Sequence, residues 1–510
     1  MLARKSLLTL SAAMLKAVFG FASTFFTARY LGATTLGTLA YLMGLVGTLA
    51  LVSDLGMHQA FRKCASENPE ENGGYVSAFI VAKTALGLLL FGACLSAPLV
   101  YPRLGAQLAA ADVRRAYWII VAYYLLNNFL SVPVLTFQAC RETAKLALPG
   151  TIGALVSSCA KIVMALAGVD LATLAIAYAL EMVVGLVVGL VLFWRYPLRR
   201  PTRAEIAHLV RYAWPMVLVT MVAYILPNVD RILVENSWGA GEVGFYAPVF
   251  GIVALMQRVP LAAMTVFFPH ASEDATKGDL REIQRRVFVI ERYLLMIIVP
   301  MSVGVALGSA HIIRLYLGEG FERSALILAV LAFNPLLLAF FEPYSTVVYA
   351  IEKHQYLVLG SLAGLVVLLV VDALLVPRSL LGVTMFGLGG LGAALGGLAS
   401  QTVIGGLQFY LARKYAGVGF YWRAVKFAVA GLSMAAVAIL IQRSEWVSVW
   451  MTAIAVVSGF GAYLATLSVL REFTLADARL MLDLLHPGKM KAYILTELRK
   501  PAEDTGRNEP

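Results

Sequence analysis

The 510-residue sequence predicts an all-α polytopic membrane protein, and three observations carry this prediction. Hydrophobic residues make up 60% of the chain and charged residues only 14%, against about a quarter in soluble proteins. The mean hydropathy is +0.79. Apolar stretches of about 20 residues, enough to cross a membrane, recur along the chain. Because one aqueous core cannot bury so much apolar surface, a soluble enzyme, a nucleic-acid-binding protein and a disordered scaffold are excluded.

The apolar stretches predict about 14 transmembrane helices. The first begins close to the N-terminus, but Lys16 interrupts it and it is too long for the core of a signal peptide, so we expect a retained helix. The other windows follow one another with short loops between them. In order, the predicted helices cover residues 6–28, 37–57, 75–99, 116–138, 146–168, 171–194, 212–234, 244–269, 287–310, 324–350, 355–376, 389–411, 424–441 and 446–469.

Basic residues are distributed unevenly over the predicted loops. With the N-terminus inside, 19 basic residues fall in inner loops and nine in outer loops. By the positive-inside rule we expect a multi-pass protein of the cytoplasmic (inner) membrane with both termini in the cytoplasm. The net charge of +11 lies among the spans and their loops, because the tail from residue 471 carries seven basic and seven acidic residues. Nucleic acid is therefore not an expected partner.

Two seven-residue segments indicate an internal repeat. Leu31–Gly37 and Trp238–Gly244 each have glycine at their second and seventh positions, and both pairs of glycines align at one offset of 207 residues. Six predicted helices separate the copies, so both halves insert in the same orientation, as in transporters with parallel repeats. The expected layout is two pseudo-equivalent six-helix lobes, residues 1–200 and 201–415, then two extra helices in 416–470 and a cytoplasmic tail, 471–510.

Three short motifs resemble one family of membrane proteins. The segment Ala28-Arg29-Tyr30-Leu31-Gly32 opens the first repeat, Asp230-Arg231-Ile232-Leu233 precedes the second, and Gly390-Leu391-Gly392-Ala393-Ala394 lies late in the chain. Together with the layout, they are similar to the polysaccharide (O-antigen-type) flippases of the multidrug/oligosaccharidyl-lipid/polysaccharide exporter superfamily. The resemblance covers roughly residues 5–470. The glycine-rich stretch before residue 389 departs from the family's pattern, and the last two helices occur only in some members.

The resemblance implies a function and a set of partners. It implies that lipid-linked (polyprenyl diphosphate) oligosaccharide units are flipped across the membrane by alternating access, for polysaccharide or lipopolysaccharide biosynthesis. The implied partners are the lipid-linked oligosaccharide, membrane lipids and other polysaccharide-assembly membrane proteins. Neither the glycan nor the carrier lipid follows from it.

Charged residues inside the predicted spans are candidates for the transport site, because a mid-membrane charge is costly and usually faces a cavity or a partner. The first lobe has Lys16, Lys83 and Lys161 against Glu181 alone, and the second has Arg258. Small residues recur at helical spacing beside Lys16, Lys161 and Arg258. The excess positive charge predicts a chamber for a lipid diphosphate. The alternative is that each charge pairs with another helix.

The polar residues of the same spans suggest further roles. Glu181 and Glu342 are candidates for coupling to H⁺ or Na⁺, with a structural salt bridge as the alternative for each. Asn127 is a candidate for binding sugar hydroxyls, although interhelical hydrogen bonding is the commoner use of such residues. Asp372 lies about one turn from the end of its window and is expected to reach the membrane interface. Glu291-Arg292 lies near the inner surface and is expected to be an anchor rather than a site.

Two other functions are alternatives to a flippase. A cation-coupled multidrug exporter of the same superfamily would more naturally have an acid-rich cavity. A membrane glycosyltransferase or glycan ligase would need carboxylates on a long outer loop, and the largest predicted outer loop has about 16 residues, with no Asp-x-Asp in the chain. Four scattered cysteines and six histidines form no metal-binding spacing. We therefore expect a transporter rather than an enzyme, without a cofactor or a resident metal.

Overall fold

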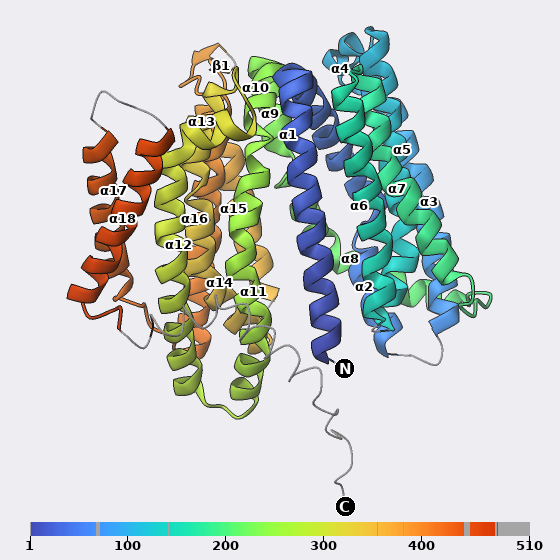
Figure 1. Cartoon of the computed structure of the whole chain (residues 1–510). Helices are drawn as coiled ribbons and strands as arrows, with labels where there is room; N and C mark the ends of the chain where they lie inside the picture. Colours follow the sequence, from blue (N-terminus) through green and yellow to red (C-terminus); the bar gives the residue numbers. More distant parts are fainter. Residues whose placement is uncertain are drawn as a thin grey trace, which may run out of the picture.

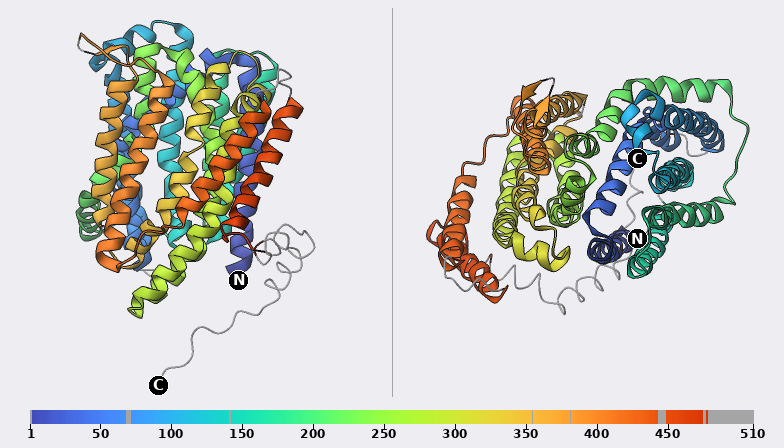
Figure 2. Two further views of the ribbon diagram at one scale, coloured as in Figure 1. Left: turned by 90° about the vertical axis from the view of Figure 1, so that its left-hand side faces the viewer. Right: turned by 90° about the horizontal axis from the view of Figure 1, so that it is seen from above.

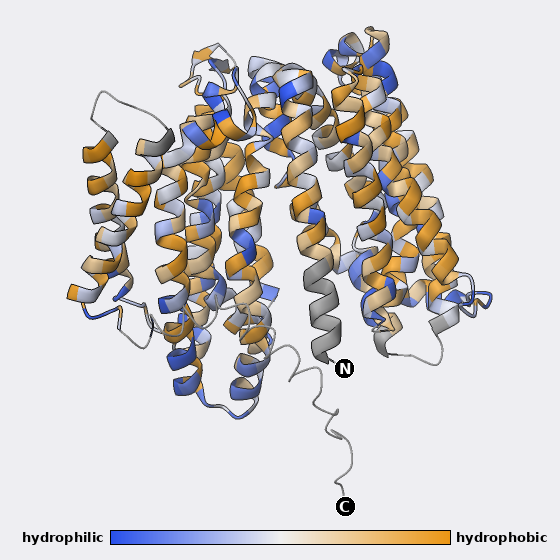
Figure 3. Cartoon of the chain, viewed as in Figure 1, coloured by the Kyte–Doolittle hydropathy of each residue, from blue (hydrophilic) through white to orange (hydrophobic). Residues whose placement is uncertain are grey.

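The computed structural model describes residues 2–67, 72–140, 142–353, 355–380, 382–442, 449–474 and 477. It is an all-α bundle, as the sequence predicts (Figure 1). Hydrophobic residues dominate the middle of the helices and hydrophilic residues gather toward the two ends (Figure 3). Most of the predicted cytoplasmic tail lies outside the described residues.

The predicted all-helical membrane architecture is confirmed, although the first two windows and the seventh are divided differently from the prediction. Within the described part of the chain, 13 helices are long and apolar enough to cross a membrane. The first, Ala12–Ser53, contains two of the predicted windows, because its helix continues through a kink at Gly32. The others are Gly73–Val100, Ala111–Ala139, Thr143–Leu166, Leu171–Phe193, Arg203–Ile225, Ala240–Thr276, Leu280–Tyr316, Glu322–Ala350, Gln355–Leu375, Gly390–Ala416, Ala424–Ile441 and Met451–Val469.

The helices form two groups that meet along α1, α9 and α10 (Figures 1 and 2). One group holds α3, α5, α6 and α7, and the other holds α11 to α16. The elements are, in chain order, α1 (Leu2–Leu49), the 3-10 helix η1 (Ala50–Ser53), α2 (Met57–Glu67), α3 (Asn72–Val100), α4 (Pro102–Gln107), α5 (Ala111–Ala139), α6 (Thr143–Leu166), α7 (Leu171–Phe193), α8 (Arg203–Ile225), α9 (Val229–Trp238), α10 (Ala240–Tyr246), α11 (Val249–Thr276), α12 (Leu280–Tyr316), α13 (Glu322–Leu331), α14 (Asn334–Ala350), α15 (Gln355–Leu375), β1 (Ser379–Leu380), β2 (Val383–Thr384), α16 (Gly390–Ala416), α17 (Ala424–Gln442) and α18 (Val449–Val469).

The backbone at the two repeat segments has the same unusual conformation. Gly32 has φ 75° and ψ 173°, and Gly239 has φ 86° and ψ 175°. Positive φ in this region is accessible to glycine and strained for other residues. The two copies of the repeat therefore turn the chain in the same way, although the sequences between their glycines differ.

The second glycine of each repeat makes the contact between the two copies. A Cβ atom added to Gly37 would overlap the carbonyl oxygen of Ala240, and one added to Gly244 would overlap the carbonyl oxygen of Ala33. The contact is reciprocal, because Ala33 and Ala240 are themselves equivalent in the repeat. We refer to Ala33, Gly37, Ala240 and Gly244 as the glycine crossing. It brings the backbones of α1 and α10 into direct contact.

The seventh predicted helix, residues 212–234, is divided in two. α8 ends at Ile225, and α9 begins at Val229 after a turn that contains Pro227, which has no amide hydrogen to donate. α9 packs against α1, whereas α8 packs against α2 and α3. α8 thus lies beside the first group of helices, although the expected boundary at residue 200 assigns it to the second lobe. The lobe boundaries stay a prediction.

The last two helices, α17 and α18, form a pair beside α12 (Figure 1). Phe427 on α17 and Tyr463 on α18 are fully buried in this contact. The Tyr463 hydroxyl donates to the carbonyl oxygen of Leu295 on α12 at 3.3 Å. The α17–α18 pair therefore contacts the second group of helices through α12.

Alanine substitutions test the glycine crossing. Gly37→Ala and Gly244→Ala should each lower the free energy of unfolding by about 3 kcal/mol, the upper end of overpacking costs, because the new methyl group meets a backbone oxygen that cannot move aside. The measurement is the melting temperature of the detergent-purified protein. Gly241→Ala is the control, since nothing lies within 4 Å of its added Cβ. Equal melting temperatures for all three variants would contradict the crossing.

Candidate functional site

Two of the predicted cations are exposed on helices that come from different halves of the chain. Lys16 lies on α1 and Arg258 on α11. Among the described residues, neither side chain has a carboxylate within ion-pair distance. The Lys16 Nζ atom lies over Gly150 of α6, 3.7 Å from the position that a Cβ would occupy there. The small residues of α6 therefore leave room beside this ammonium group.

Lys161 belongs to a second, more buried group. Its Nζ atom lies 3.6 Å from the centre of the Tyr178 ring, and Glu181, one turn further along α7, is within electrostatic range. Tyr123 of α5 is also within electrostatic range of Glu181, and Arg231 of α9 is within electrostatic range of Tyr178. We call Lys161, Tyr178, Glu181, Tyr123 and Arg231 the aromatic cluster. It contains two cations and one carboxylate.

Lys16 and the aromatic cluster stand at different depths. Gly150 and Lys161 are both on α6, eleven residues apart, which is about 16 Å along a helix. The structure therefore places the Lys16 ammonium group beside Gly150 and Lys161 about 16 Å further along α6. The two cations do not meet at one point. Arg231 lies on α9 with its side chain against Gly44 of α1.

Lys83 differs from Lys16 and Arg258 because it has an acid partner. It therefore does not contribute to the predicted excess of unpaired positive charge. Its side chain is fully buried, its Nζ donates to the carbonyl oxygen of Ser53 at 2.9 Å, and it lies 3.9 Å from Asp54. Asp54 also contacts His58 at 3.0 Å. Lys83 thus has the interhelical ion pair that the alternative interpretation describes, and Asp54 is the partner that the sequence analysis missed.

The two neighbouring asparagines of α5 have different surroundings. Asn128 is buried and donates to the backbone oxygen of Lys83 at 2.8 Å, so it joins α5 to α3. Asn127, the predicted sugar-binding residue, is exposed. Its role stays a prediction.

Glu342 on α14 is half-buried. No cation of the described chain forms an ion pair with it, so the structural salt bridge that is the alternative for this acid is not present among the described residues. Glu181 likewise has no ion pair within 4 Å among the described residues. Both acids stay candidates for ion coupling.

A second pair of acids, which the sequence does not predict to lie together, is buried inside the bundle. Asp230 of α9 and Asp372 of α15 are buried, and their carboxyl groups are close enough for a hydrogen bond when one is protonated. The Tyr246 hydroxyl donates to Asp230 at 2.7 Å. A Cβ atom on Gly396 of α16 would overlap an oxygen of Asp372. The expectation that Asp372 reaches the interface is wrong, because the glycine of α16 provides room for its carboxyl group inside the bundle.

The carboxyl groups of this acid pair have few hydrogen-bond partners. Both oxygens of Asp372 and one of Asp230 are buried without a hydrogen-bond partner. Two buried carboxylates at close range cannot both stay charged without a proton or a cation between them. The described chain has no group of three or more histidine, cysteine or acidic side chains that could hold a metal ion.

The fold defines a polytopic all-α membrane protein with charged side chains inside its spans. The sequence model of the family described as "Polysaccharide biosynthesis protein" matches residues 2–273, just over half of the chain. The chain therefore belongs to the polysaccharide biosynthesis protein family, as the motifs indicate. No curated protein matches the sequence significantly.

Several solved structures of membrane proteins have a similar fold. The lipid II flippase MurJ in an inward closed conformation matches with a TM-score of 0.71 and 14% identity, over 91% of this chain and 98% of that chain. An inward-facing multidrug resistance MATE family transporter of the MOP superfamily matches with a TM-score of 0.65 and 15% identity, over 81% and 98%. An outward-facing MATE structure gives 0.56, with 15% identity, over 81% and 94%. These similarities show the fold.

The contrast between Lys83 and Lys16 makes a prediction about stability. Lys83→Met should lower the free energy of unfolding by about 3 kcal/mol, because it leaves a buried carboxylate without its cation. Lys16→Met is the matched control and should leave the melting temperature unchanged. Adding Asp54→Asn to Lys83→Met should restore part of the loss. An unchanged melting temperature for Lys83→Met would show that the ion pair does not stabilise the fold.

Proposed function

We propose that this transporter flips lipid-linked (polyprenyl diphosphate) oligosaccharide units across the cytoplasmic membrane by alternating access. The family and the likeness to a lipid II flippase over nearly the whole chain support this proposal. The observation that carries it is the set of cations without acid partners: Lys16 and Arg258, on helices of opposite halves. Unpaired positive charges of this kind attract an anionic ligand, and the diphosphate of a lipid-linked oligosaccharide is such an anion.

The chemistry of the cations suits a diphosphate that must be both bound and released. At an effective dielectric constant near 20, each charge pair at about 4 Å contributes about 4 kcal/mol before the cost of desolvation is subtracted. Lys16 is exposed, so it keeps part of its hydration while the site is empty. Because Lys161 lies further along α6, we propose that the diphosphate meets Lys16 and Lys161 in succession.

The contacts between the two halves support alternating access. Apart from α8, the helices of the second half that pack extensively against α1–α7 in the described structure are α9 and α10. Near the glycine crossing, Arg29 of α1 donates to the carbonyl oxygen of Leu315 on α12 at 2.7 Å, and the Phe21 and Tyr316 rings stack at 3.9 Å. We propose that this end is the closed outer gate of an inward state. The higher similarity to inward conformations agrees with this proposal.

We further propose that Asp230 and Asp372 couple transport to H⁺ or Na⁺, alongside the predicted acids Glu181 and Glu342. Asp230 directly precedes Arg231 on α9, and Arg231 belongs to the aromatic cluster. The charge of the acid pair therefore acts on the proposed substrate path. Binding of a cation would neutralise the pair, and its loss would leave like charges in repulsion. This difference could bias the equilibrium between two states.

A cation-coupled multidrug exporter is the second candidate function. The similarity to MATE transporters and the buried Asp230–Asp372 pair favour it. Exposed Lys16 and Arg258 would repel a cationic drug, which is why the flippase is preferred.

For either function we propose a location in the inner membrane with both termini in the cytoplasm. For the flippase we propose other polysaccharide-assembly membrane proteins as partners.

Removal of the exposed lysine tests the proposed substrate site. Lys16→Ala should reduce glycan export at least about tenfold at normal protein abundance, because it removes one charge pair with the diphosphate, and tenfold corresponds to only about 1.4 kcal/mol. Lys16→Arg should retain part of the export. The measurement is polysaccharide export in a strain lacking the chromosomal copy, with protein abundance measured in parallel.

Arg200→Ala removes an exposed positive charge from the segment between α7 and α8, and it should leave export unchanged. Full export by the Lys16→Ala, Lys161→Ala double variant at normal abundance would contradict the proposal. Loss of export that follows loss of protein would instead assign these lysines to the stability of the fold.

A further inference from the structure

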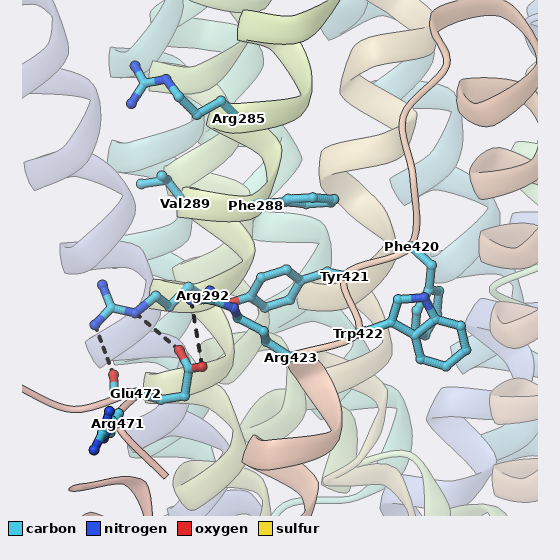
Figure 4. Close-up of a pocket in the computed structure, with 10 residues that line it drawn as sticks. All are labelled: Arg285, Phe288, Val289, Arg292, Phe420, Tyr421, Trp422, Arg423, Arg471 and Glu472. Atoms are coloured by element: carbon cyan, nitrogen blue, oxygen red, sulfur yellow. Dashed lines mark hydrogen bonds and ion pairs between the residues drawn. The ribbon is translucent and has the colours of Figure 1, made fainter.

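A pocket of roughly 630 Å³ lies outside the proposed substrate path, between α12, the segment before α17 and the segment after α18 (Figure 4). It stands at the end of the bundle that carries the N-terminus (Figure 1). Its lining combines arginines with aromatic rings and one carboxylate. The residues that matter here are Arg292, Tyr421, Trp422, Arg423, Arg471 and Glu472.

The pocket lies at the boundary of the predicted membrane spans. Arg423 directly precedes α17, and Arg471 follows the last residue of α18 by two positions. The phosphate groups of a bilayer lie at this boundary, where the hydrocarbon ends. Trp422 is 76% exposed beside Arg423, as expected for an aromatic side chain at the membrane interface.

The charges around the pocket do not balance. Glu472 is almost fully buried and lies 2.7 Å from Lys426, 3.7 Å from Arg292 and 3.8 Å from Arg423. Arg292 also contacts Asp477 at 2.6 Å. Arg471 lines the pocket without an ion pair in the described part of the chain. Three cations thus share two carboxylates, with Arg423 largely exposed and at the longest ion-pair distance, and Arg471 adds a fourth positive charge.

The backbone holds Arg471 in a conformation that a side chain disfavours. Arg471 has φ 59°, its amide donates to the carbonyl oxygen of Ser468, and the next amide donates to that of Leu467. This is a Schellman ending of α18 with arginine at the position where glycine is usual. A residue kept under backbone strain beside a pocket points to a function for its side chain.

We propose that this pocket binds the phosphate of an anionic phospholipid, between Arg423 and Arg471, with the lipid chains on the apolar side beyond Trp422. Basic pockets between transmembrane helices at the cytoplasmic side are known to bind anionic headgroups. A lipid is favoured over a soluble anion because the pocket adjoins the ends of two spans and carries interfacial aromatic residues. The bound lipid would link α12 to the α17–α18 pair, and it is independent of the transported substrate.

Tryptophan quenching tests the proposal on the full-length protein in lipid vesicles. The vesicles contain phosphatidylcholine with increasing amounts of either brominated phosphatidylglycerol or brominated phosphatidylcholine, because bromine quenches nearby tryptophans. The Trp422 signal is the difference between the wild type and Trp422→Phe. The test variant is Arg423→Gln with Arg471→Gly, since glycine suits the backbone at 471. Arg195→Gln with Arg281→Gln is the control of equal charge, at exposed positions outside the pocket.

The proposal expects phosphatidylglycerol to quench the Trp422 signal at lower amounts than phosphatidylcholine. The test variant should bind phosphatidylglycerol roughly thirtyfold more weakly, since each basic residue near an anionic lipid contributes about fivefold. The control variant should behave like the wild type. Melting temperatures verify that the variants are folded, and a normal Arg471→Gly protein with weakened quenching supports the proposal on its own.

Three results would overturn the site. They are equal quenching by the two lipids, a preference for phosphatidylglycerol that survives in the test variant, and loss of the preference in the control variant. Inorganic phosphate that abolishes the preference, where chloride at the same ionic strength does not, would assign the pocket to a soluble anion instead.

Discussion

The architecture depends on one close contact, the reciprocal crossing of Gly37 over Ala240 and of Gly244 over Ala33. Any side chain at these two glycines would separate the backbones of α1 and α10. The kinks at Gly32 and Gly239 turn the chain beside this contact. The crossing joins the halves near one end and leaves them fewer contacts elsewhere. Such an attachment allows two rigid groups of helices to pivot, which the proposed alternating access requires.

The charged side chains fall into two kinds, and the difference decides which of them we propose to bear on transport. Lys83 and Glu472 have partners at short range, so they hold helices together. Lys16 and Arg258 are exposed and have none among the described residues. A charge with a partner is already neutralised, whereas a charge without one is available to a ligand. The proposed function rests on the second kind, and the proposed lipid site on the unpaired Arg471.

Much of the fold could be predicted because it depends on local patterns. Apolar stretches fix the spans, and the repeated glycines fix the turns and the crossing, since only glycine permits both. The pairing of charges could not be predicted in the same way. Asp54 with Lys83 and Asp230 with Asp372 join residues from different helices, and the rotation of each helix about its axis decides such pairs. The glycine-rich start of α16, which makes room for Asp372, was the available signal.

The central claim is that the protein moves a lipid diphosphate rather than a cationic drug, and direct flipping tests it. The measurement is the transbilayer movement of a fluorescent polyprenyl diphosphate oligosaccharide in vesicles that contain only the purified protein. The account predicts that movement is faster than in protein-free vesicles and depends on a gradient of H⁺ or Na⁺. Movement at the protein-free rate, together with transport of a cationic dye by the same vesicles, would contradict it.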